Sequence, residues 1–152
     1  MAWIKAWEGI VEKDWLDQLE HVNFLTYQHI ADLASGEIWR RAKDNSGPAQ
    51  DVQFVLTETH VCYIRELRLG APVEISTCLI AYDSKRFHLF HRLESTGNLV
   101  CTVETMNLCF DPATRRVVPL PAVVSSHFAS WGGGAPHTIQ AQLSIGRRPS
   151  YN

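Results

Sequence analysis

The spacing of hydrophobic residues along the chain changes from helical to strand-like before its middle. Residues 3–11 show a short strand-like pattern that ends in a polar loop around Lys13. Asn23, a favoured helix N-cap, then precedes an apolar-rich stretch that runs to about Lys43. The apolar residues of this stretch cover more than one stripe, which predicts a helix largely enclosed by other structure.

From Gln53 onward the period is two, which is typical of strands. The alternating runs are residues 53–63, 73–82, 86–94 and 99–110. Short turn-prone segments separate the later runs, and consecutive strands joined in this way predict an antiparallel meander. A strand, a long helix and then these strands predict an α+β domain in which a curved antiparallel sheet wraps the helix.

The carboxyl-terminal part of the chain reads as a short helix and a polar tail. Prolines precede residues 123–131, which we interpret as a short terminal helix. We therefore expect a single domain over residues 1–131. Three glycines then open a tail over residues 132–152, which we expect to be mobile or to dock on a partner.

Composition and charge narrow the class of protein. The 152 residues are 45% hydrophobic and 20% charged, with a formal net charge of -2, which suits one ordinary soluble domain. Such a balance argues against a nucleic-acid partner, because phosphate binding needs a concentrated basic surface. No stretch approaches the roughly 18 apolar residues of a membrane span, and the amino terminus lacks signal-peptide features, so we expect a cytoplasmic protein without a membrane partner.

Cysteine and histidine residues do not suggest a metal site. The cysteines form no C-x-x-C pair and all fall in strand-like segments, where we expect reduced, buried thiols: Cys62, Cys78, Cys101 and Cys109. Histidines within the predicted elements have no recognisable ligand spacing and are expected to be core or surface residues: His29, His60, His88 and His91.

The segment before the predicted helix carries the candidate chemistry. It holds Asp17, Glu20, His21 and Asn23. Unpaired N–H groups at a helix N-terminus can receive a carbonyl oxygen that becomes an oxyanion, while a nearby carboxylate attacks the carbonyl carbon or activates water. This favours hydrolysis of an activated acyl group over phosphoryl or hydride transfer, since no P-loop or G-x-G-x-x-G motif is present. The alternative, that Asp17 and Asn23 only cap the loop and the helix, stays open.

The order of these motifs resembles a known family. The pattern Asp17-x-x-Glu20-His21-Val22-Asn23-x-x-x-Tyr27 precedes a long helix, and residues 63–70 lead into a strand. From Trp3 to Pro121 the chain resembles the hotdog-fold acyl-CoA thioesterases, in particular the 4-hydroxybenzoyl-CoA thioesterase-like group. The resemblance implies a homodimer, or a dimer of dimers, whose sheets join edge to edge and whose active sites lie where helices meet the neighbouring subunit.

The resemblance also implies residue roles. Asp17 would be the catalytic carboxylate, and Asn23 with the amides of residues 22–24 would lie by the thioester carbonyl. His21 would help to shape the loop, and Tyr27 would line the acyl pocket. Phe24 and Trp15 are further candidates for substrate contacts. No metal is implied, and no cofactor beyond the coenzyme A of the substrate itself.

Glu20 departs from the family pattern, which usually has glycine at this position. Glycine permits backbone torsions and close approaches that glutamate resists. Either the loop is rebuilt or Glu20 has a role of its own: it could share acid and base work with Asp17, or it could simply be solvated.

A coenzyme A thioester carries phosphates, so its enzyme needs cations near the site. The candidates are Arg65, Arg68, Lys85 and Arg86, each of which could also be an ordinary surface residue.

Tryptophans suggest a more specific substrate. Trp3, Trp7, Trp15 and Trp39 fall near the proposed site or on its helix. Aromatic faces attract quaternary ammonium groups, and the context of Asp14 to Asp17 resembles thioesterases of bacterial carnitine breakdown. Together these suggest betainyl-CoA or another trimethylammonium acyl substrate; ordinary core or interface tryptophans are the alternative.

Three functional hypotheses follow from the sequence. The first is an acyl-CoA thioesterase that uses Asp17. The second is a hotdog dimer that binds an acyl-CoA or another small molecule without turnover, which the Glu20 departure favours. The third is a hydratase or dehydratase of acyl thioesters, although the longer hydratase pattern is absent.

Overall fold

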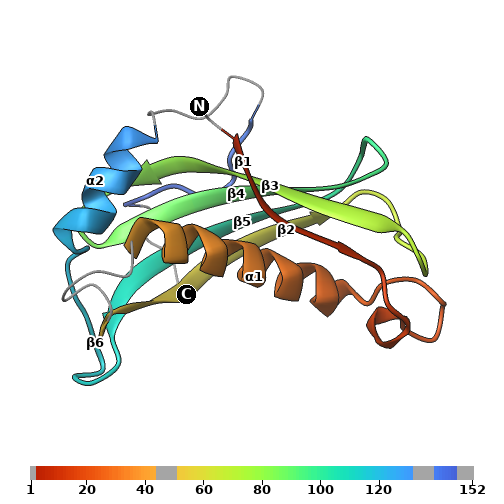
Figure 1. The fold of residues 1–152 in the computed structure, drawn as a ribbon, viewed down its shortest axis with the longest axis horizontal. Helices are drawn as coiled ribbons and strands as arrows, with labels where there is room; N and C mark the ends of the chain where they lie inside the picture. Colours follow the sequence, from red (N-terminus) through yellow and green to blue (C-terminus); the bar gives the residue numbers. More distant parts are fainter. Residues whose placement is uncertain (1–2, 44–50, 132–138, 147–152) are drawn as a thin grey trace, which may run out of the picture.

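The computed structural model describes residues 3–43, 51–131 and 139–146 (Figure 1). Its helices and strands follow the predicted order, with a two-residue strand, β6, that the pattern did not predict. The elements are β1 (Trp3–Ile10), a 3-10 turn (Lys13–Trp15), α1 (Phe24–Lys43), β2 (Gln53–Tyr63), β3 (Pro72–Tyr82), β4 (Arg86–Ser95), β5 (Asn98–Asp111), β6 (Arg116–Val117) and α2 (Ala122–Ser130).

The strands form one antiparallel sheet in the order β1-β3-β4-β5-β2, with β6 paired to β5. The predicted meander is confirmed for β3, β4 and β5. It is wrong for β2, which pairs with β5 and not with β3. Residues 64–71 do not make a tight turn but carry the chain past β5 and β4 to the position of β3 in the sheet. Figure 1 shows the curved sheet with α1 lying along one face, the predicted α+β arrangement.

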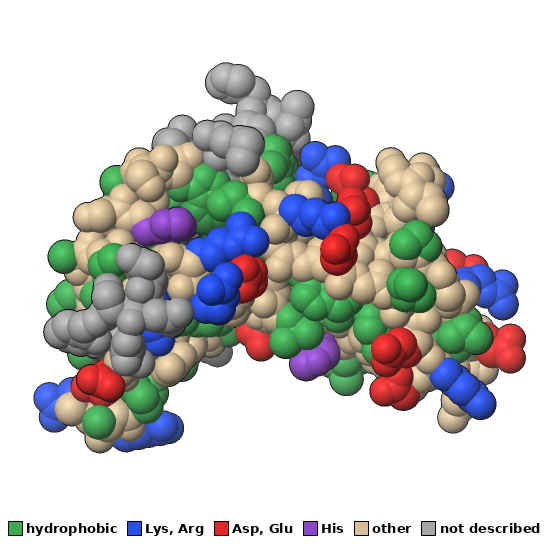
Figure 2. Space-filling view, viewed as in Figure 1, with side chains coloured by type: hydrophobic (Ala, Val, Ile, Leu, Met, Phe, Trp, Pro, Cys, Tyr) green, Lys and Arg blue, Asp and Glu red, His purple; other side chains and the backbone are tan. Residues whose placement is uncertain are grey.

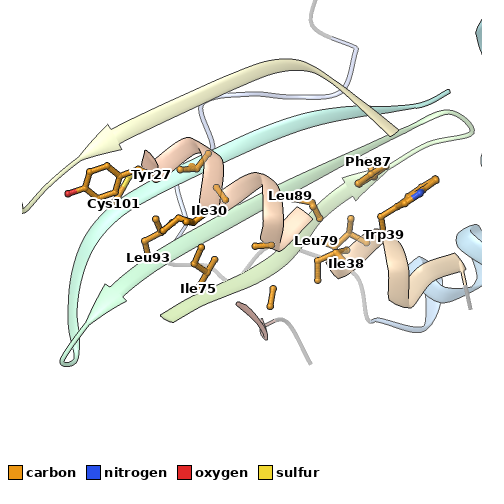
Figure 3. Close-up of a cluster of buried hydrophobic side chains, with 14 of the residues drawn as sticks. Tyr27, Ile30, Ile38, Trp39, Ile75, Leu79, Phe87, Leu89, Leu93 and Cys101 are labelled. Atoms are coloured by element: carbon orange, nitrogen blue, oxygen red, sulfur yellow. The ribbon is translucent and has the colours of Figure 1, made fainter. Parts of the chain in front are cut away.

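One stripe of α1 packs against the sheet. Its buried residues recur at intervals of three and four or adjoin one another, as expected for one helical face: Tyr27, Ile30, Ala31, Ala34, Ser35, Ile38, Trp39 and Ala42. Figure 3 shows this stripe meeting side chains from β3, β4 and β5. The prediction of an enclosed helix is wrong for the single chain, because Leu25 and Leu33 on the opposite face are 58% and 44% exposed.

A histidine joins α1 to the middle of the sheet. His91 on β4 is buried, with Nε2 2.9 Å from Ser35 Oγ on α1 and Nδ1 2.7 Å from Thr77 Oγ1 on β3. Complete burial lowers the pKa of His91 to about 3, because the apolar surroundings disfavour the charged ring. His91 is therefore a neutral core residue whose two ring nitrogens are both hydrogen-bonded.

A buried glutamate binds the described part of the tail to the sheet. Glu104 Oε1 lies 3.1 Å from His88 Nε2 and accepts the Leu143 N–H at 3.1 Å, and the Gln142 N–H donates to the same carboxylate. Because the adjacent Val103 belongs to the core, Glu104 points to the sheet face away from α1. Gln142 and Leu143 thus contact the sheet of their own chain; residues 132–138 and 147–152 of the predicted tail lie outside the described residues.

The cysteine prediction holds at three of four positions. Cys78, Cys101 and Cys109 are free and buried, and burial raises the pKa of Cys78 and Cys101 to about 12 and that of Cys109 to about 11. Cys62 is free but exposed, which corrects the expectation. It lies on β2, an edge strand in this chain, next to Val61, which packs against the core, so Cys62 points to the opposite face of the strand.

The strict alternation expected along β2 is also interrupted. Phe54 and Val61 both pack against the core although their sequence separation is odd. A β-bulge between Leu56 and Glu58 accounts for this, since one extra residue exchanges the two faces of a strand.

The surface carries charges of both signs. In Figure 2, Lys and Arg side chains lie among Asp and Glu side chains on the face shown. Ion pairs join several of them, including Arg41 with Glu37 at 2.8 Å and Lys5 with Glu74 at 2.8 Å. None of the described helices is long and apolar enough to cross a membrane.

We predict that stability falls between pH 7 and pH 5 through the buried histidines. Burial lowers the pKa of His91 and of His88, so below about pH 6.5 these two histidines take up more protons in the unfolded chain than in the folded chain. For His91 alone this costs about 2 kcal/mol of unfolding free energy across that interval. Urea unfolding at both pH values should show a smaller difference for His91→Gln than for the wild type; an equal difference would contradict the prediction.

Candidate active site

A cavity of about 290 Å³ opens where α1 begins. The loop before α1, the first turns of α1 and the end of β2 with the residues after it surround this space. The lining residues are Asp17, His21, Val22, Phe24, Tyr27, Tyr63, Ile64, Arg65 and Glu66. Of the residues proposed from the sequence, the structure therefore brings together Asp17, His21, Phe24, Tyr27 and Arg65.

Tyr27 holds the two loops of the site together. Its hydroxyl accepts the Leu67 N–H at 3.2 Å and lies 3.5 Å from the carbonyl oxygen of Arg65, its acceptor. The Val22 N–H also donates to the Leu67 carbonyl at 2.9 Å. Burial raises the pKa of Tyr27, so this phenol stays protonated at neutral pH. Tyr27 thus lines the cavity and anchors the backbone that carries Glu66.

A histidine lies between two carboxylates at the mouth of the site. His21 Nε2 is 3.2 Å from Asp17 Oδ2, and His21 Nδ1 is 3.2 Å from Glu66 Oε2. The other oxygen of Asp17 accepts the Leu19 N–H at 2.8 Å, which fixes the orientation of the carboxylate. Asp17 and His21 remain 30% and 32% exposed, so both can be reached from the cavity.

The amides at the start of α1 are unequally available. The Val22 N–H is bonded to Leu67, the Asn23 N–H donates to the Trp15 carbonyl at 2.8 Å, and the Leu25 N–H is capped by Asn23 Oδ1 at 2.8 Å. The Phe24 N–H has no acceptor among the described residues. Of the amides of residues 22–24, only that of Phe24 remains to receive a carbonyl oxygen, and the side chain of Asn23 acts as a helix cap.

Glu20 occupies a backbone conformation that suits glycine. Its φ is +61°, in the left-handed region, which costs a non-glycine residue about 1 kcal/mol. Glu20 thus has the kind of backbone conformation for which a glycine is favoured. Its side chain is 81% exposed, lies 3.9 Å from Arg68 and does not line the cavity. The departure from the family pattern thus gives little support to a binding-only protein.

Aromatic rings form one wall of the cavity. Tyr63 lies with its ring centre 6.5 Å from that of Phe24 and 5.4 Å from that of Tyr27, both edge to face. The Tyr63 hydroxyl donates to the Phe24 carbonyl at 3.0 Å. Tyr63, Ile64 and Glu66 belong to the 63–70 segment of the family pattern, but the sequence predicted no site role for them, because their approach to the Asp17 loop depends on the path of residues 64–71.

The tryptophans named from the sequence lie elsewhere. Trp15 packs on Trp7 with ring centres 6.0 Å apart, and Trp39 stacks on Phe87 in the core at 5.5 Å. Trp3 packs on Phe90, with Arg92 above its ring. None of them lines the cavity.

The four candidate cations fall into two groups. Arg65 and Arg68 line a second hollow of about 170 Å³ that shares Arg65 and Glu66 with the main cavity. Lys85 and Arg86 lie at the opposite end of the sheet: Arg86 pairs with Leu108, whereas Tyr63 pairs with Cys101. At about 3.3 Å per residue this separation is roughly 23 Å, and Arg86 is bound to Asp83 at 2.8 Å. Within one chain they do not join the site.

Comparison with solved structures agrees with this fold. A Staphylococcus aureus protein solved in complex with CoA matches with a TM-score of 0.72 and 23% identity, over 100% of this chain and 98% of that one. A 1,4-dihydroxy-2-naphthoyl-CoA thioesterase from Synechocystis matches with a TM-score of 0.69 and 16% identity, over 81% and 93% of the two chains. The arrangement defines the class as the α+β hotdog fold.

The sequence comparison names the family. The profile of the Thioesterase-like superfamily matches residues 11–128, and the chain belongs to this superfamily. An L-carnitine dehydrogenase/betainyl-CoA thioesterase from Agrobacterium fabrum is 29% identical over 120 residues, which are 78% of this chain but 25% of that protein. A betainyl-CoA thioesterase from Pseudomonas aeruginosa is 26% identical over 99 residues, 62% of this chain and 61% of that protein.

We predict that Asn23→Ala lowers the unfolding free energy by about 1 kcal/mol, because it removes the cap of the Leu25 N–H. Asn23→Ser, which keeps a capping oxygen, should restore most of the loss. Thermal unfolding of both variants measures this, and equal melting temperatures for the wild type and Asn23→Ala would refute the capping role.

Proposed function

We propose that this protein hydrolyses an acyl-CoA thioester to the free acid and CoA. The observation that carries the proposal is that the Asp17 carboxylate and Phe24, whose N–H has no acceptor among the described residues, line the same cavity at the start of α1. A thioester carbonyl in this cavity would receive a hydrogen bond at the positive end of the helix while a carboxylate approaches its carbon. Family membership and the names of the relatives support the same reaction.

Two routes give the same products. In one, a carboxylate oxygen of Asp17 attacks the thioester carbon, the C–S bond breaks to release CoA, and water hydrolyses the resulting anhydride. In the other, Asp17 takes a proton from water as the water attacks, and the C–S bond breaks on collapse of the tetrahedral intermediate. Either route develops negative charge on the carbonyl oxygen, which the Phe24 amide stabilises.

Replacement of Asp17 by Asn tests the proposed role. We expect kcat to fall by about 100-fold to 10,000-fold, because the amide can neither attack nor accept a proton efficiently. CoA release from a panel of acyl-CoAs, followed with a thiol reagent, measures this, with Asp14→Asn as the control for a nearby exposed carboxylate. Full turnover by Asp17→Asn would remove Asp17 from the mechanism, and binding without CoA release by the wild type would identify a binding protein.

The substrate class that we propose is a trimethylammonium acyl-CoA such as betainyl-CoA. The rings of Phe24, Tyr27 and Tyr63 line the cavity together with the carboxylate of Asp17, and these groups suit a quaternary ammonium ion. The printed names of the relatives include betainyl-CoA thioesterases. The aromatic support comes from these rings and not from the tryptophans that the sequence suggested.

A neutral isostere separates charge from shape. We expect kcat/KM for betainyl-CoA to exceed that for 3,3-dimethylbutyryl-CoA, which replaces the nitrogen by carbon, by about 10-fold or more. Tyr63→Leu should lower this ratio. The loss of packing affects both substrates equally, whereas the loss of the aromatic ring weakens only the attraction for the positively charged substrate. A ratio near one in the wild type would argue for a neutral acyl group.

Assembly, cofactor use and location complete the proposal. We infer a homodimer in which β2, the edge strand nearest the cavity, pairs with β2 of a second copy, as the family resemblance implies. The exposed side chains of Leu56 and Ile64 beside this edge support it.

Arg65 and Arg68 would receive the CoA phosphates, and Lys85 and Arg86 would act only if a partner chain brought them near. The reaction needs no cofactor beyond the substrate's CoA, and the free thiols fit a cytoplasmic location.

A further inference from the structure

We propose that Glu66 is a positioning residue that acts on Asp17 through His21. The proposal rests on the proposed thioesterase function, because it assigns the reacting group to Asp17. It adds a residue from the β2–β3 connection to the site and gives His21 a defined partner on each ring nitrogen.

The geometry links the three side chains in one line. Glu66 Oε2 lies 3.2 Å from His21 Nδ1, and His21 Nε2 lies 3.2 Å from Asp17 Oδ2. A carboxylate only accepts hydrogen bonds, so the ring that makes both contacts as hydrogen bonds is the imidazolium, which carries one N–H on each nitrogen and donates Nδ1–H to Glu66 and Nε2–H to Asp17. Glu66 therefore selects the ring orientation in which Nε2 faces Asp17.

The backbone around Glu66 is held on both sides. The Arg65 carbonyl accepts from the Tyr27 hydroxyl, the Leu67 N–H donates to the same hydroxyl, and the Leu67 carbonyl accepts from Val22. Glu66 thus projects from an anchored segment, although its side chain is 58% exposed. Its carboxylate has no other hydrogen-bond or ion-pair partner among the described residues. The histidine that it contacts also lies 3.2 Å from Asp17.

A positioning role for Glu66 and a direct contact of Glu66 with the substrate predict different behaviour. Glu66 lines the cavity and could face the ammonium group of a cationic substrate. A counterion role would depend on the substrate's charge and would not need His21. A positioning role would depend on His21 and would not need a charged substrate.

Kinetics of single and double variants test the proposal. Glu66→Ala should lower kcat about 10-fold with KM changed less than about threefold, as expected for losing a charge-assisted hydrogen bond that orients a reacting group. Glu66→Gln keeps an acceptor for Nδ1–H and should recover most of kcat. The loss should be the same for betainyl-CoA and for 3,3-dimethylbutyryl-CoA. Glu12→Ala, at an exposed carboxylate without a side-chain cap hydrogen bond, is the matched control.

The double variant provides the decisive comparison. In a His21→Ala background, Glu66→Ala should have no further effect, because its effect runs through the missing ring. Additive losses, or a loss confined to the cationic substrate, would overturn the positioning role and assign Glu66 to substrate binding. An unchanged kcat for Glu66→Ala would overturn it as well.

A measurement that does not depend on turnover distinguishes failure of the Glu66–His21 proposal from failure of the thioesterase proposal. NMR of the His21 ring nitrogens should show a hydrogen on Nδ1 in the wild type and in Glu66→Gln, and a loss of that preference in Glu66→Ala. If the wild type releases no CoA but the ring responds in this way, the thioesterase proposal fails and the Glu66–His21 link stands. If the wild type is active and neither kcat nor the ring responds, the link fails alone.

Discussion

The burial of one face of α1 against the sheet is the interaction on which the rest of the structure depends. The stripe from Tyr27 to Ala42 supplies the helix side of the core, and β3, β4 and β5 supply the other. Within it, His91 bonds to Ser35 and Thr77, so that the helix has a polar anchor as well as an apolar face. Buried polar groups of this kind are costly to leave unpaired, which restricts how the helix can lie on the sheet.

This packing places the amino-terminal end of α1 where the site requires it. Tyr27 belongs both to the buried stripe and to the clamp on residues 65–67. The same side chain therefore connects the core to the loop that carries Glu66, while the residues before α1 bring Asp17 and His21 to the other side of the cavity. A site built across two loops is held by the core beneath it rather than by either loop alone.

The two sheet faces serve different purposes in the single chain. One face packs on α1, and on the other Glu104 binds the backbone of Gln142 and Leu143. The edge strand β2 combines a bulge, exposed apolar side chains and Tyr63 from the cavity wall. The cavity therefore opens close to the β2 edge of the sheet, which is consistent with a partner subunit lying near the site.

The order of elements, the start of α1 at Phe24 and the Asp17 to Tyr27 motif could all be predicted from the sequence, because N-caps, hydrophobic periods and short motifs are local properties. The sequence also marked position 20 as unusual, because the family pattern usually has glycine there. Glycine is the residue that adopts a left-handed φ most easily, and Glu20 has such a φ. The pairing of β2 with β5, the approach of Glu66 and Tyr63 to Asp17, the exposure of Cys62 and the distance of Lys85 from the cavity came only from the tertiary structure. These features depend on which distant segments meet when the core closes, and neither periodicity nor spacing along the chain carries that information.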